Sequence, residues 1–432
     1  MKNIIFHIDV NSAFLSWEAV YRLAHKGEKQ DLREVVSAVG GDAALRRGII
    51  LAKSIPAKSY GIKTGETILE AQRKCRELVL VPPNYRLYEK CSGAFMEILR
   101  EYSDAVEPYS IDEAFVDMGT SCHLFGTPEE TAEQIKNHIR KELGFTVNVG
   151  VSSNKLLAKM ASDFQKPDRV HTLYPEEIQK KMWPLPVSDL FFVGRAAAGR
   201  LFSVGIRTIG ELAKADPAWL KSMLKKQGEL IWGFANGIDL SPVLENPAGN
   251  KGYGNSTTTP FDVADEETAD RVLLALCELV GGRLRADRVQ VCVVSVGVRY
   301  TDFVYVSHQK KLQSPTNLTL ELYGAARRLF RELWNQRPVR HLGVHTSGVS
   351  GSDTGRQLSI FDEIDYEKLG RMDQTVDGIR KRFGEDAVRR AVFLEQPADD
   401  RNGGRGDGIW NWYKPAGSGR GQCQGNTGEN CL

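Results

Sequence analysis

The sequence predicts a protein of α+β class that is built from several domains. Two stretches, residues 4–170 and 253–348, alternate β-like runs with helical patterns, and a mainly helical stretch separates them. The length of 432 residues exceeds what one hydrophobic core usually supports. In the second stretch, two strands and two helices packed as two layers are expected to form a small domain.

Composition places the chain among ordinary globular proteins. Hydrophobic residues make up 41% and charged residues 26%, and the net charge of +2 by itself says nothing about nucleic acid. The seven cysteines form no C-x-x-C pair, which argues against zinc and fits reduced thiols. The apolar run at residues 4–8 is too short for a signal sequence or a membrane span. We therefore expect a cytoplasmic protein with no membrane association.

In the first stretch, acidic residues stand at the tips of predicted strands. The strand at 4–8 ends at Asp9, and a hairpin with strands at 106–111 and 114–118 turns at Asp112-Glu113. The other elements expected here are helices at 14–23, 70–76, 86–105 and 132–143, and strands at 35–39, 49–52, 78–81 and 146–151, with Gly40-Gly41 as a turn.

Beyond residue 170 the pattern changes twice. Short helices are expected to about residue 240, two of them around the turn at 204–206. The later elements expected are helices at 265–286 and 316–335, strands at 289–299 and 303–308, a linker at 345–356, a helix within 365–395 with a β-like run at 391–394, and a disordered tail after 397.

The strand-end carboxylates predict phosphoryl-transfer chemistry. Two-metal catalysis needs acidic oxygen ligands that hold two ions roughly 4 Å apart, and Mg²⁺ prefers such ligands. If the strands that end at Asp9 and near Asp112 and Glu113 are neighbours, the three carboxylates converge. The other interpretation is that they are solvated turn residues, and the pattern alone leaves both open.

Three segments resemble the Y-family, or translesion, DNA polymerases. They are HIDVNSAF at 7–14, YSIDEAFVD at 109–117 and GVSSNKLLAKMASDFQKP at 150–167, in that family's order and spacing. The resemblance covers about residues 1–350. It implies a right-hand polymerase with a ferredoxin-like palm (1–20 and 78–167), small fingers (21–77), a helical thumb (168–240), an α+β little finger (250–348), and then a linker with a helix (349–396) and a tail (397–432).

The resemblance also assigns the metal site. Asp9 and Asp112 would bridge two Mg²⁺ ions, Glu113 would hold the catalytic ion near the primer 3′-OH, and the carbonyl of Val10 would hold the nucleotide-bound ion. Asn11 departs from the Asp of many DinB-type members, which leaves the choice between DinB-type and UmuC-type open.

The same resemblance predicts a deoxynucleotide pocket. Phe14 would be the steric gate that excludes a 2′-OH, although a core aromatic is the alternative. Lys58 and Lys166 would bind the triphosphate, with Ile55 standing where relatives have Tyr. Ser12, Ala13 and Ser54 complete the predicted pocket. In the helix from Asn154, five apolar residues are expected in the core, and Lys155 and Lys159 are expected either in solvent or on DNA.

Three further segments predict macromolecular partners. Residues 192–213 resemble the helix–hairpin–helix of the thumb, in which Gly194 and Gly205 suit tight turns and Arg195 and Arg200 would contact the DNA backbone. Phe192 departs there from a frequent glycine. Basic residues outnumber acidic ones in 251–349, which indicates a DNA-binding face. The peptide 357–361 resembles a sliding-clamp-binding motif, with contacts from Gln357, Leu358, Ile360 and Phe361.

The expected activity is template-directed addition of dNTPs to a DNA primer, with low fidelity, lesion bypass and no proofreading. The protein would bind primer-template DNA, dNTPs and the β clamp, and otherwise be monomeric. Two other classes stay open at this stage. One is a palm-fold nucleotide cyclase, and the other is a non-catalytic accessory bound to DNA and the clamp.

Overall fold

The structure is a computed structural model that describes residues 3–41, 48–245, 249–352, 365–384 and 386–393. The chain divides into two compact units. Residues 1–41 and 49–248 form the first, and residues 249–432, grouped with 42–48, form the second. The predicted clamp contacts at Gln357, Leu358, Ile360 and Phe361 lie outside the described residues. No helix in the described part of the chain is long and apolar enough to cross a membrane.

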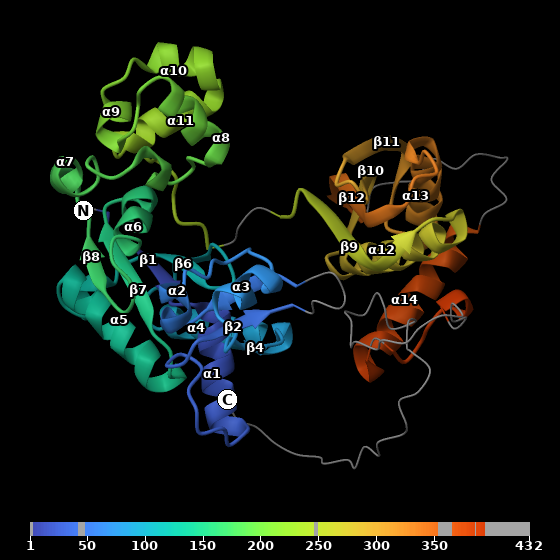
Figure 1. Cartoon of the computed structure of the whole chain (residues 1–432), viewed down its shortest axis with the longest axis horizontal. Coiled ribbons are helices and arrows are strands. Elements are labelled where there is room, and N and C mark those ends of the chain that lie inside the picture. Colours follow the sequence, from blue (N-terminus) through green and yellow to red (C-terminus); the bar gives the residue numbers. More distant parts are fainter. Residues whose placement is uncertain (1–2, 42–47, 246–248, 353–364, 385, 394–432) are drawn as a thin grey trace. The chain divides into compact units, whose positions relative to one another are not determined.

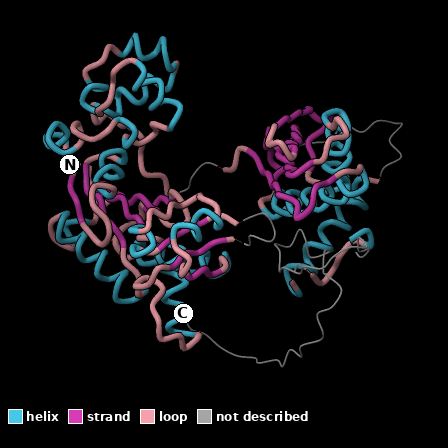
Figure 2. Tube along the Cα trace, viewed as in Figure 1, coloured by secondary structure: helices cyan, strands magenta, loops and turns pink. Residues whose placement is uncertain are grey.

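A five-stranded sheet in the order β5-β6-β1-β7-β8 organises the first unit (Figures 1 and 2). Its central strand β1 (Ile5–Val10) is wholly buried and pairs antiparallel with β6 on one side and β7 on the other. Helices α4 and α5 complete a β-α-β-β-α-β arrangement, which is the ferredoxin-like pattern. The other elements are β5 (Val106–Pro108), β6 (Glu113–Asp117), β7 (Val147–Ser152), β8 (Val170–Thr172), α4 (Tyr85–Arg100) and α5 (Pro128–Leu143).

Local sequence signals explain the ends of these helices. Thr127 and Glu130 form a reciprocal capping box at the start of α5, and Gly144 ends it at φ 72°, a conformation that glycine adopts without strain. The predicted helix at 132–143 therefore begins one turn earlier.

The predicted hairpin also needs correction, because β5 ends at Pro108 and Glu113 is the first residue of β6 rather than a turn residue.

Helix α6 (Lys155–Ser162) packs closely on the same sheet. Asn154 caps its first turn, since the Asn154 side chain accepts a hydrogen bond from the Leu157 N–H. At Gly150 in β7 a Cβ atom would lie 1.9 Å from the Ala158 carbonyl oxygen, so only glycine permits this approach. The predicted apolar face of α6 is confirmed, because Leu156, Leu157, Met160 and Ala161 are buried and Phe164 packs against them.

A three-stranded sheet in the order β3-β2-β4 forms a separate layer of the first unit. Thr67 and Glu70 form a capping box at the start of α3, as in α5. The short helix α2 was not predicted, and its N-cap is Ser54. The elements are β2 (Ser37–Gly40), β3 (Ile50–Lys53), α2 (Ile55–Ser59), α3 (Ile68–Lys74) and β4 (Val79–Val81); α1 (Ala13–His25) contacts β2 and β3.

Residues 178–235 are helical, as predicted, and share a core with α6. The turn between α8 and α9 uses Gly205 at φ 87°, as expected from its residue type. Gly194 is different: it is an extended N-cap at φ −77°, and the left-handed residue is Phe192 at φ 70°. The helices are α7 (Ile178–Lys181), α8 (Arg195–Ser203), α9 (Ile209–Ala213), α10 (Pro217–Leu224) and α11 (Lys226–Ala235).

The second unit contains a four-stranded antiparallel sheet in the order β11-β10-β12-β9, covered by α12 and α13. The predicted linker at 345–356 is wrong over its first half, because β12 continues to Gly351. The Ser, Thr and Gly content of this segment concealed its alternation, in which Thr346 is buried between the exposed His345 and Ser347. Strand β9 was also missed. The elements are β9 (Gly252–Val263), α12 (Glu266–Ala286), β10 (Val289–Tyr300), β11 (Tyr305–Thr316), α13 (Thr319–Leu333) and β12 (Val339–Gly351).

A final helix, α14 (Tyr366–Phe383), docks on α12 through buried charges. The Arg285 guanidinium lies 3.1 Å from Asp373 and 2.5 Å from Asp377, and the Asp373 carboxylate also accepts the Thr319 N–H. Residues 391–393 form a 3₁₀ turn rather than the predicted β-like run, and Phe393 is buried in the core of this unit.

Candidate active site

Strand pairing places two of the predicted metal ligands side by side. Asp9 and Glu113 are register partners across β1 and β6. Both side chains lie on the face of the sheet that α6 covers, and both are largely buried. The Val10 N–H donates to the Asp112 carbonyl, which ties the loop before β6 to the end of β1. The neighbouring strands that the carboxylate hypothesis required are therefore present.

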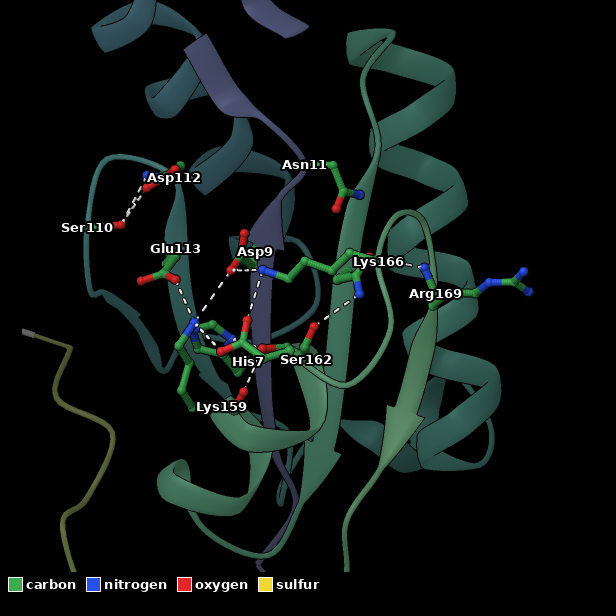
Figure 3. Close-up of polar contacts among 12 residues, drawn as sticks. His7, Asp9, Asn11, Ser110, Asp112, Glu113, Lys159, Ser162, Lys166 and Arg169 are labelled. Atoms are coloured by element: carbon green, nitrogen blue, oxygen red, sulfur yellow. Dashed lines mark hydrogen bonds and ion pairs between the residues drawn. The ribbon is translucent and has the colours of Figure 1, made fainter. Parts of the chain in front are cut away.

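Two lysines contact these carboxylates (Figure 3). The Lys159 ammonium lies 2.7 Å from Glu113 and 3.4 Å from Asp9. The Lys166 ammonium lies 2.8 Å from the same Asp9 oxygen. Asp163 pairs with both lysines, at 3.2 and 2.9 Å. Three acidic and two basic side chains thus form one continuous ion-pair network.

Asp112 is outside this network. Its carboxylate accepts a hydrogen bond of 2.7 Å from the Ser110 hydroxyl and points away from Asp9 (Figure 3). Within the ranges that the structure describes, no three His, Cys, Asp or Glu side chains are grouped closely enough to hold a metal ion. The backbone therefore brings the three predicted ligands to one region, whereas their side chains are not yet gathered around a common point.

Burial and charge both affect ionisation in the network. Burial raises the pKa of Glu113, and the neighbouring Asp9 acts in the same direction, while Lys159 opposes them. Burial alone would lower the pKa of Lys159, but the carboxylates of Asp163, Asp9 and Glu113 outweigh it and raise that pKa. The same competition raises the pKa of Lys166. Both lysines are consequently cationic wherever the carboxylates are ionised.

A buried histidine lies behind the carboxylates. His7 Nδ1 is 2.8 Å from the Ser162 hydroxyl, which itself donates to the Lys159 carbonyl. Burial lowers the pKa of His7 well below its usual value, with Lys159 and Lys166 adding to the effect. His7 is therefore neutral and joins β1 to α6 by a hydrogen bond.

The chemistry of the donor set fits divalent cations. Carboxylate oxygens on adjacent strands are the hard ligands that Mg²⁺ prefers. The ammonium groups of Lys159 and Lys166 already occupy positions beside these oxygens where positive charge is favourable. Asp9 and Glu113 thus provide the kind of oxygen donors that a divalent cation requires, whereas the Asp112 carboxylate is bonded to Ser110 in this structure.

Phe14 is held against a cluster of aromatic rings. Its ring stacks on Tyr88 with centroids 4.6 Å apart and planes 13° apart. The Trp17 ring is tilted against it by 53°, and the Tyr85 ring makes an edge contact at 82°. Tyr88 is buried and donates to the Glu18 carboxylate. Phe14 is only partly buried, so one part of a rigidly supported ring remains open. The ring therefore packs against other aromatic residues as a core aromatic does, and its role as a steric gate stays a prediction.

The other predicted nucleotide contacts differ in accessibility. Lys58 is exposed on α2, and Ser12 is exposed at the start of α1, while Ala13 is buried. Ser54 is buried, and its hydroxyl bonds the backbone of Ala57, Ser37 and Val35. The Ser54 hydroxyl thus helps to hold the local backbone, and its contact with a nucleotide stays a prediction.

The predicted DNA contacts lie on one helical pair. Arg195 and Arg200 are exposed on α8, which follows Gly194, and Gly205 precedes α9. Phe192 tolerates its left-handed conformation while its ring contacts Phe191 and Phe234, at 4.6 and 5.8 Å. The hairpin therefore forms without the expected glycine.

Sequence reasoning missed the importance of Lys159. It was expected either in solvent or on DNA, yet its side chain is 10% exposed and contacts the carboxylates. The available signal was that Lys159 follows Lys155 by four residues on an otherwise apolar helix. This spacing did not indicate that Lys159 contacts Glu113 and Asp9.

Comparisons with known proteins agree with this architecture. Residues 8–163 match the model of the impB/mucB/samB family, and residues 250–360 match that of its C-terminal domain. A protein described as DNA polymerase IV from Clostridium acetobutylicum is 45% identical over 92% of this chain and 99% of its own length. DNA polymerase IV 2 from Bacillus subtilis is 40% identical over 91% and 95%. A solved Y-family DNA polymerase chimera superposes with a TM-score of 0.69 at 24% identity, covering 80% of this chain and 99% of its own, which confirms the predicted fold class.

Proposed function

The chain belongs to the impB/mucB/samB family of Y-family DNA polymerases, and from this membership we propose how its own residues perform DNA synthesis. It is a template-directed DNA polymerase that adds dNTPs to a primer 3′-OH and copies past damaged bases. The pairing of Asp9 with Glu113 across adjacent strands is the observation that most supports the assignment of the active site. Neither a cyclase nor a non-catalytic accessory is favoured by relatives that match over nearly the whole chain.

We assign the metal ligands to Asp9, Asp112, Glu113 and the Val10 carbonyl. Two Mg²⁺ ions held there would lower the pKa of the attacking hydroxyl and neutralise charge on the transferred phosphoryl group. Asp112 must first leave Ser110, to which it is bonded at 2.7 Å. A divalent cation offers a carboxylate a stronger interaction than a neutral hydroxyl does, so this rotation is favourable on binding.

The remaining assignments concern the nucleotide. Phe14 would exclude a ribose 2′-OH, because the buried Tyr88 ring stacked against it prevents the Phe14 ring from moving away. Lys166 and Lys58 would bind the triphosphate as point charges. Ser12 and Ala13 at the start of α1 would lie beside it and present backbone N–H groups.

We further propose two classes of macromolecular contact and a cellular location. Arg195, Arg200 and the backbone at Gly194 and Gly205 would bind DNA phosphates without reading bases. Gln357, Leu358, Ile360 and Phe361 would bind a sliding clamp, with the protein otherwise monomeric. Action on chromosomal DNA would place the protein in the bacterial cytoplasm.

Primer extension tests this assignment. The full chain is incubated with Mg²⁺, dNTPs and a primed template, either undamaged or with an abasic site. Asp112→Ala is expected to lose at least about a hundredfold in rate, because a metal ligand that acts in the transition state is removed. Asp104→Ala is the matched control, since Asp104 is an exposed acid in the loop before β5. Equal activity of Asp112→Ala and the wild type would contradict the assigned metal site.

A further inference from the structure

One buried ammonium group contacts three carboxylates at the candidate active site. Lys159 Nζ lies 2.7 Å from Glu113, 3.2 Å from Asp163 and 3.4 Å from Asp9. Its side chain is 10% exposed, whereas that of Lys166 is 37% exposed. Lys159 is therefore the less accessible of the two cations, and a role in contacting DNA or a triphosphate does not explain its position.

The neighbouring acids require a positive charge when no metal is bound. Asp9 and Glu113 are register partners, so their carboxylates lie close together in a largely buried region. Two like charges in such an environment repel each other, and each also loses hydration energy. Close packing at Gly150 fixes α6 against the sheet, which holds Lys159 beside both acids.

We propose that Lys159 is a positioning residue that serves as a resident counterion for Asp9 and Glu113 and competes with the divalent cation for them. The inference rests on the proposed function, because it takes these acids as metal ligands. While the metal is absent, the Lys159 ammonium group lies between the two acids and compensates their negative charge. When the metal binds, the ammonium group gives up part of its contact with them.

Competition of this kind has a measurable thermodynamic consequence. If Lys159 and the metal share the same carboxylates, each weakens the other's interaction by the same factor, because coupling between two sites is reciprocal. Removal of the lysine charge should therefore tighten metal binding to the free protein. A lysine that only stabilises the fold would leave metal affinity unchanged.

The test uses the full chain and Mn²⁺ alone, without DNA or nucleotide. Mn²⁺ binding is measured by electron paramagnetic resonance, and the thermal midpoint is measured with and without Mn²⁺. Lys159→Met is expected to lower the midpoint without metal, to bind Mn²⁺ roughly three- to tenfold more tightly, and to gain more stability from Mn²⁺ than the wild type does. Lys159→Arg keeps the charge and should retain wild-type affinity.

Lys155→Met is the matched control. Lys155 lies one turn away on α6, has a 13% exposed side chain and pairs with Glu107 at 2.7 Å, away from the candidate ligands. Its loss should lower the midpoint equally with and without Mn²⁺ and leave Mn²⁺ affinity unchanged. If Lys159→Met does not fold, Lys159→Gln provides the same comparison with a polar side chain.

Three results would overturn the inference: unchanged or weaker Mn²⁺ binding after loss of the Lys159 charge, an equal loss of midpoint with and without Mn²⁺, or no Mn²⁺ binding by any form. Primer extension by the wild type is measured in parallel. Extension with unchanged Mn²⁺ affinity in the variants refutes the counterion alone, whereas tighter Mn²⁺ binding without any extension refutes only the proposed polymerase function.

Discussion

The substitution Gly150→Ala tests how the sheet positions α6. A Cβ atom at residue 150 would lie 1.9 Å from the Ala158 carbonyl oxygen and 2.5 Å from the Ser162 amide nitrogen. Ordinary contact begins near 3.4 Å, so α6 must move by about 1.5 Å, the difference between 3.4 and 1.9. Both obstructing atoms belong to the backbone, which cannot turn aside as a flexible side chain does.

This displacement should reduce both stability and activity. Overpacking of this kind costs about 1–3 kcal/mol of unfolding free energy. The 2.7 Å contact between Lys159 and Glu113 would also be lost, because both groups lie at the interface that opens. Misplacement by about 1 Å near reacting groups can cost about a hundredfold in rate.

Urea unfolding, followed by hydrogen exchange in peptides from β7 and α6, measures the stability change in this part of the first unit. Gly93→Ala is the control, because Gly93 is exposed within α4 and a Cβ atom added there would meet no heavy atom within 4 Å. Alanine there should stabilise by about 0.5–1 kcal/mol through helix propensity. If Gly150→Ala were as stable as Gly93→Ala, the close approach of α6 to β7 would be refuted.

Two further predictions concern other regions. Asp373→Ala should lower the free energy of unfolding by about 3 kcal/mol, because it removes a buried partner of Arg285 and the acceptor for the Thr319 N–H. Trypsin should then cleave α14 faster, and an unchanged cleavage rate would contradict the docking role. Burial raises the pKa of the Cys91 thiol to about 11. The rate of Cys91 alkylation should therefore rise about tenfold per pH unit from pH 8 to 10, because the thiolate is the reactive form. A plateau of that rate near pH 8.5, measured by mass-spectrometric labelling, would contradict the shift.

Elements with strong periodicity or distinct caps could be predicted from sequence. The wholly buried β1 appears as a continuous apolar run, and the face of α6 appears as regularly spaced apolar residues. Strands β9 and β12 were harder, because they are rich in Thr, Ser and Gly, which is the composition of a linker, although Thr257, Thr259 and Thr346 are buried. Pairing with β10 and β9, together with packing of Leu342 and Val344 under the helices, makes residues 339–351 a strand.

The site shows the same division between local and distant information. Asp9, Asp112 and Glu113 could be identified as candidate ligands from sequence, because each lies in a short motif at the end of a predicted strand. Asp163, one partner of Lys159, is four residues away, but Asp9 and Glu113 lie 150 and 46 residues away in sequence, so spacing within α6 gave no sign of those two. The side chain of Asp112 has a local partner instead, the Ser110 hydroxyl two residues before it, and the motif that marked Asp112 carried no information on this hydrogen bond.

The place of β1 in its sheet bears on how the acid at its end is protected from local opening. Strands β6 and β7 flank β1, so neither of its edges is free. Amides bonded between two such neighbours exchange with solvent mainly through large-scale unfolding, whereas edge strands fray at little cost. Asp9 therefore belongs to the segment of the first unit with the slowest expected exchange, and Lys58, on an exposed short helix, belongs to one that opens readily. The geometry of the carboxylates and that of the nucleotide contacts can thus fluctuate on different timescales.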